Sequence, residues 1–90
     1  MPVPGILTRY FPAVQIVAPE GTVLTETWAE LHRADPPSRW GHWWGLVGVN
    51  LQTWRGIKLI LQTPQTSGVI VVEETGAEVS DVFGVGAAPF

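Results

Sequence analysis

The sequence predicts a small, mainly β domain (a small α+β fold): an antiparallel meander that forms a small barrel or sandwich with one short helix. From residue 45 onward, short Val- and Ile-rich runs follow one another, separated by short segments rich in Gly, Thr and Pro. Connections this short join only antiparallel neighbours. One helical pattern, over residues 25–35, precedes these runs. We therefore expect residues 1–90 to form a single domain.

The N-terminal part of the chain is rich in proline, which has no N–H to donate to a strand ladder. Residues 1–12 are expected to form an extended N-terminal arm. The segment AVQIVA, residues 13–18, is predicted to be a short strand, and the following PEG, residues 19–21, is typical of a turn.

The segment TETWAELHRAD, residues 25–35, predicts a short helix. Thr27 and Glu30 have the spacing of a capping box, in which each side chain satisfies a free backbone N–H at the helix start. Trp28, Leu31 and His32 fall on one helical face. The two prolines that follow are expected to end the helix.

Residues 45–84 are expected to form a β-meander of about four strands. The predicted strands cover residues 46–54, 56–62, 68–74 and 77–84. In the third of these, the run from Val69 to Val72 is apolar on both faces, which predicts a central strand that is covered on both sides. In so short a chain the second cover is expected to come from another subunit.

Residues 85–90 are expected to form an apolar C-terminal tail. The chain carries no charge from Val82 to Phe90. An apolar tail of this kind should leave water, so we expect it to dock on its own sheet or on a neighbouring molecule.

The chain carries few charges for its size. Hydrophobic residues make up 46% of it and charged residues 14%, whereas an ordinary globular domain is roughly 25% charged. A chain of 90 residues buries only about two-thirds of its unfolded surface, and cysteine is absent, so disulfides cannot add stability. These observations favour a protein that hides part of its surface against copies or partners.

Composition also bears on partners and compartment. The net charge is −3 and no cluster of Lys and Arg is present, which disfavours nucleic acid as a partner. The N-terminus does not resemble a signal peptide, and no run approaches the length of a membrane span. We therefore expect no membrane partner and a protein in the cytoplasm or in a virion.

The segment RWGHWWG, residues 39–45, places three tryptophans, a histidine and two glycines in seven positions. Three interpretations stay open: aromatic rings that anchor the core, a protein–protein interface, or a platform that stacks on a carbohydrate or peptide. The residues predicted to form an interface or ligand platform are Arg39, Trp40, His42, Trp43, Trp44, Trp54, Arg55, Val69, Val71, Phe83 and Phe90.

Chemistry-bearing patterns are weak in this sequence. His32 and His42 are the only histidines, and they lack the further ligands that a zinc or iron site needs, so no metal or cofactor is expected. Ser38, His42 and Asp35 share one loop, but this spacing does not by itself build a catalytic triad, and we predict no catalytic residues.

The sequence therefore favours a non-enzymatic structural or assembly protein, a small β-rich subunit that oligomerises or coats a larger particle such as a virion or shell. Its partner would be protein. Two alternatives stay open: a module that binds carbohydrate or peptide through the Trp/Arg loop, and a small inhibitor of a larger enzyme.

Overall fold

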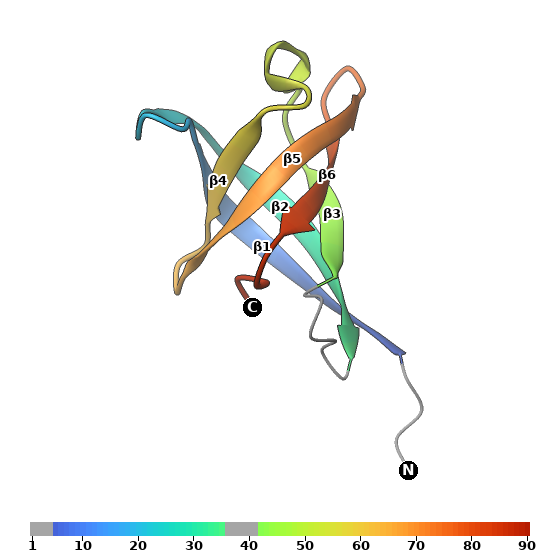
Figure 1. Ribbon diagram of the computed structural model, residues 1–90. Helices are drawn as coiled ribbons and strands as arrows, with labels where there is room; N and C mark the ends of the chain where they lie inside the picture. Colours follow the sequence, from blue (N-terminus) through green and yellow to red (C-terminus); the bar gives the residue numbers. More distant parts are fainter. Residues whose placement is uncertain (1–4, 36–41) are drawn as a thin grey trace.

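The computed structural model describes residues 5–35 and 42–90, which contain six β-strands in a closed barrel (Figure 1). The elements are β1 (Gly5–Val17), β2 (Val23–Asp35), β3 (Trp43–Val47), the 3₁₀ turn η1 (Gln52–Trp54), β4 (Lys58–Gln62), β5 (Ser67–Thr75) and β6 (Ser80–Val85). The order around the barrel is β1-β2-β3-β6-β5-β4, and all neighbours are antiparallel. The predicted mainly β class and antiparallel barrel are confirmed.

The helix predicted over residues 25–35 is wrong, because this segment lies within strand β2. Ala29 and Leu31 alternate inward into the core, which is the period of a strand. β1 pairs with one edge of β2 and β3 with the other, so strand pairing satisfies backbone groups that a helix would have bonded internally. Thr27 does not cap a helix; its hydroxyl donates a 2.8 Å hydrogen bond to the carbonyl of Gly48. Among the described residues, the only helical element is the 3₁₀ turn η1.

The prediction of four consecutive meander strands is correct for β4, β5 and β6 but wrong for β3. Strand β3 pairs with β2 and β6, and the chain then crosses one end of the barrel before it enters β4. Buried Ser80 holds this crossing in place: its hydroxyl accepts a 2.9 Å hydrogen bond from the N–H of Leu51 and donates a 2.7 Å bond to the carbonyl of Val49.

Most of the predicted N-terminal arm forms part of the barrel wall, and the predicted C-terminal tail packs against the barrel. Residues 5–11 of the arm pair with β2, and Pro12 lies where a bulge interrupts the ladder between Phe11 and Val14. Residues 1–4 lie outside the described residues. Pro89 is buried, and Phe90 packs against the core with its ring edge-on to Phe11 at 6.3 Å between centroids. The tail was predicted to dock on its own sheet or on a neighbouring molecule, and it docks on its own barrel.

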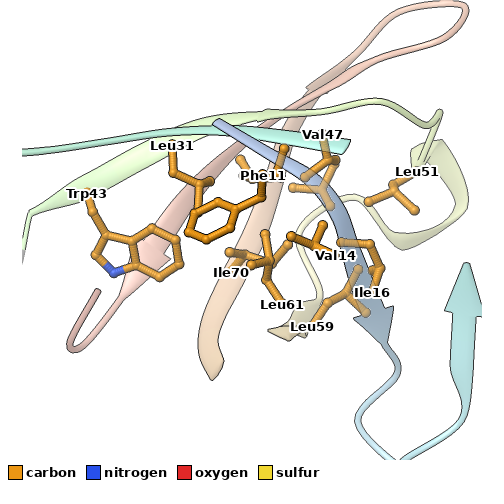
Figure 2. Close-up of a cluster of buried hydrophobic side chains, with 13 residues drawn as sticks. Phe11, Val14, Ile16, Leu31, Trp43, Val47, Leu51, Leu59, Leu61 and Ile70 are labelled. Carbon is orange, nitrogen blue, oxygen red and sulfur yellow. The ribbon is translucent and has the colours of Figure 1, made fainter. Parts of the chain in front are cut away.

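The barrel interior is filled by apolar side chains from all six strands and from Leu51 (Figure 2). Trp43 is the largest of them and is 1% exposed. Glycines on β5 and β6 leave room for its indole. A Cβ atom on Gly84 would lie 1.9 Å from the ring, and one on Gly68 would lie 2.9 Å away. The indole Nε1 donates a 3.1 Å hydrogen bond to the carbonyl of Gly86. The ring therefore ties β3 to β5 and β6.

We expect Gly84→Ala to lower the free energy of unfolding by about 3 kcal/mol or to prevent folding, because the added methyl group overlaps the indole of Trp43. Urea unfolding followed by circular dichroism measures this. The control is Gly76→Ala, where the nearest atom to the new Cβ would be 3.6 Å away; its stability should change by less than about 1 kcal/mol. Equal stability of the two variants would contradict the packing described.

Candidate protein-interaction surface

Apolar side chains cover part of the outside of the barrel. Successive side chains along a strand point to opposite faces of the sheet, so residues that pair across neighbouring strands point to the same face. Trp44 pairs with Phe83, which pairs with Val71, and the adjacent outward row joins Val85 to Val69 and Val69 to Ile60. These six side chains, which we call the outer stripe, cross the barrel from β3 to β4.

The outer stripe is partly exposed, whereas the residues that alternate with its members in β5 are buried. In β5, Ile70 and Val72 are 0% and 1% exposed, but Val69 and Val71 are only half-buried. Phe83 on β6 is 36% exposed, which places it among the most exposed large hydrophobic residues of the described chain. The predicted two-sided strand is therefore central in the sheet, with its inner side covered by the core and its outer side open.

Trp43 and Trp44 are neighbours in sequence but belong to opposite faces of β3. Trp43 lies in the core, whereas Trp44 is half-buried on the outside. The imidazoles of His32 and His42 flank the outer indole, with ring centroids 5.6 and 5.0 Å from that of Trp44. His32 also shares a 2.8 Å hydrogen bond, through Nδ1, with the hydroxyl of Thr8. The row of paired outer residues thus continues from the stripe onto β2 and β1.

The remaining predicted site residues that the structure describes do not join this surface. Arg39 and Trp40 lie outside the described residues. Trp54 packs against the core beyond the end of β3, opposite to the end where Trp43 lies. Arg55 is exposed beside it, and its Nε donates a 2.7 Å hydrogen bond to a carbonyl of β5. Phe90 packs on the core. The described tryptophans therefore do not gather into the predicted platform around Trp43.

Several members of the exposed apolar surface were not predicted from the sequence. Ile6 and Tyr10 on β1 are 62% and 60% exposed, and the ring of Tyr10 stacks on Trp28 at 6.2 Å. Ile60 and Val85 complete the outer stripe. The alternation of Val69 with Ile70 was the signal that could have located the stripe, but assigning the outer face needed the cross-strand register.

Reactive groups are dispersed over the described chain. The acidic residues of the last hairpin, Glu73, Glu74, Glu78 and Asp81, are exposed. No group of three or more His, Cys, Asp or Glu within residues 5–35 and 42–90 is arranged to hold a metal ion. A shallow pocket of about 440 Å³ beside the bulge of β1 is lined by Ala13, Val14, Gln15, Glu26, Gln62, Thr63 and Pro64, so Glu26 is its single ionisable group.

Comparisons of the chain with protein-family models, with curated proteins and with solved structures gave no match. No helix in the described parts of the chain is long and apolar enough to cross a membrane.

We expect Trp43→Phe to lower the free energy of unfolding by at least about 2 kcal/mol, because it leaves a cavity and removes the hydrogen bond to Gly86. Trp44→Phe, one position along on the outer face, should change it by less than about 0.5 kcal/mol. Urea unfolding at low protein concentration compares the two variants. A larger loss for Trp44→Phe would show that the assignment of the two faces is wrong.

Proposed function

We propose that the protein is a non-enzymatic structural subunit that assembles with further copies of itself and builds or coats a larger particle, such as a virion or shell, inside a cell. The observation that carries this proposal is the outer stripe. It is a contiguous apolar surface on the outside of a barrel whose inside already holds a complete core of its own. Covering apolar surface of this kind with another molecule removes it from water, which lowers the free energy.

The composition of the stripe supports a protein partner. Aromatic residues are enriched at the centres of protein interfaces, and charged residues are depleted there. Trp44 and Phe83 lie next to each other in the stripe, and no member of the stripe is charged. The low charge content of the whole chain, 14%, is consistent with a surface that is partly hidden in an assembly.

Charges at the borders of the stripe favour a second copy as the molecule that covers it. Lys58 pairs with Val71 at the β4 side, whereas Asp81 and Glu30 both pair with Leu46 at the β3 side. Two stripes packed antiparallel about a twofold axis would bring the ammonium of each copy toward the carboxylates of the other. Such complementarity contributes to orientation and specificity.

The test is the molar mass of the protein as a function of concentration, measured by light scattering. We expect the wild-type chain to exceed the monomer mass of 9.8 kDa, and Phe83→Glu to form smaller species, because the new carboxylate would be buried in the contact. Phe83 lies outside the core, so the variant should keep the circular dichroism spectrum of the wild type.

The control for this test is Gln65→Glu, which adds the same charge at an exposed position in the β4–β5 turn. It should assemble as the wild type does. A wild-type mass of 9.8 kDa at every concentration, or equal masses for Phe83→Glu and Gln65→Glu, would contradict the proposal.

A second candidate function, binding of a carbohydrate or peptide, is favoured by one observation: His32 and His42 lie beside the half-buried indole of Trp44. Rings and polar nitrogens in this arrangement suit stacking on a sugar or a proline. Titration with a panel of glycans and peptides should then shift the tryptophan fluorescence of the wild type and leave that of Trp44→Phe unchanged. No shift with any member of the panel would contradict this candidate.

A further inference from the structure

Strand β1 has a long edge that pairs with no other described strand. Strand β2 pairs with β1 from Gly5 to Val17, but on the other edge β4 pairs only with residues 15–17. Figure 1 shows the β1/β2 hairpin extending past the other strands of the barrel. The edge of residues 5–11 that faces away from β2 is therefore available, among the described strands, for pairing with another chain.

The hydrogen bonds of β2 identify the backbone groups that point to this edge. The N–H of Ala34 donates to the carbonyl of His42 and the carbonyl of Trp28 accepts from Gly48, so the even-numbered residues of β2 bond to β3. In an antiparallel sheet such residues form non-hydrogen-bonded pairs with the strand on their other side. Their partners on β1 are Ile6, Thr8 and Tyr10.

Ile6, Thr8 and Tyr10 therefore direct their N–H and C=O groups away from β2, toward the free edge. The 2.8 Å contact between the side chains of Thr8 and His32 agrees with this assignment, because side chains approach more closely in non-hydrogen-bonded pairs. The edge thus presents three residues whose outward donor and acceptor pair with no described strand, spaced as in a strand ladder.

We propose that this edge pairs with the same edge of a second copy, antiparallel and about a twofold axis that passes beside Thr8. In this register Thr8 lies opposite Thr8 of the second copy, and Ile6 lies opposite Tyr10 in both directions. Each of these pairs exchanges two N–H···O=C hydrogen bonds. The contact is isologous, which is the commonest arrangement in homo-oligomers.

Proline positions and charge favour this register over its neighbours. Pro4 and Pro12 lie four residues before and after Thr8, and neither has an N–H, so the run of edge donors is centred on Thr8. A register centred on Arg9 would set two guanidinium groups opposite each other, which is destabilising. A register centred on Leu7 would place Tyr10 opposite Pro4 and lose a hydrogen bond.

Side chains on β1 match in the proposed register. Ile6 and Tyr10 are the two most exposed large hydrophobic residues of the described chain, and the pairing would place each beside the other across the contact. Tyr10 is already held by its stacking on Trp28. Arg9 would lie opposite Leu7, and its guanidinium leans over the ring of Phe11, on the side away from Thr8.

Edge pairing would also extend the outer surface of the barrel across two copies. The paired residues Phe83, Trp44, His32 and Thr8 form one row on the outer face, and the row would continue through Thr8 of the second copy. Both outer stripes would then lie on one continuous face. This contact does not rest on the proposed function of the stripe, because it uses backbone groups of a different strand.

The test compares Thr8→Pro with Thr8→Val in a Phe83→Glu background, in which the edge is the remaining contact. Both substitutions remove the hydroxyl that bonds His32, but only proline removes the N–H that points to the second copy. We expect Phe83→Glu with Thr8→Val to have twice the mass of the monomer and Phe83→Glu with Thr8→Pro to be monomeric. Equal masses for the two would overturn the proposal.

Cross-linking tests the same contact if the proline variant does not fold. The natural chain has no cysteine, so Thr8→Cys introduces one thiol per copy. A short bismaleimide, which adds one cysteine thiol at each end, should join two copies through position 8 and leave Gln65→Cys, on the distant β4–β5 turn, at the background level. Equal yields at the two positions would overturn the proposal. Efficient linking at position 8 that persists in Phe83→Glu would show that the edge contact forms independently of the outer stripe.

Discussion

The indole of Trp43 is the contact on which the barrel depends. It extends from β3 across the interior to the glycines of β5 and β6, where any larger residue would collide with the ring. Its N–H bonds to Gly86 just after β6, and buried Pro89 lies beside the same glycine of β5 that faces the indole. One large side chain and the space left by glycine therefore hold together strands that are distant in sequence. A tightly packed interior of this kind tolerates little change in volume.

The apolar residues on the outward side of the strands lie outside the filled interior. Because successive residues of a strand alternate between faces, Ile70 and Val72 supply the core while Val69 and Val71 are left outside. Within residues 5–35 and 42–90, neither β1 nor the C-terminal Phe90 covers the outer stripe, since Phe90 packs on the core and β1 lies in the barrel wall. Part of the apolar content of this weakly charged chain is thus located on the outer stripe, which we propose mediates association.

Local sequence patterns predicted much of the fold. Alternation and turn residues located β4, β5 and β6, and the apolar run around Ile70 indicated a central strand. The capping-box spacing of Thr27 and Glu30 wrongly predicted a helix, because it reflects only a local preference. Pairing of β2 with strands on both of its edges makes this segment a strand. Contacts distant in sequence, such as that between β3 and β6, leave no local trace.

The candidate surface was predictable in part, for the same reason. Val69, Val71 and Phe83 were predicted as interface residues, and the register places them together. It separates Trp43 from Trp44, however, and no local pattern says which of two neighbouring indoles faces the core. The free edge of β1 was not predicted either, since its prolines suggested an extended arm outside the strand ladder. These features emerge only when the barrel closes.

A dilution series of methyl NMR spectra tests most directly whether the outer stripe becomes covered by a second copy while the core stays unchanged. Outer methyl groups of Val69, Val71 and Ile60 should change chemical shift as concentration rises, while those of Ile70, Val72 and Leu61, which alternate with them, should stay constant. Spectra that superimpose at every concentration, or shifts that affect the buried methyl groups equally, would contradict this covering by a second copy.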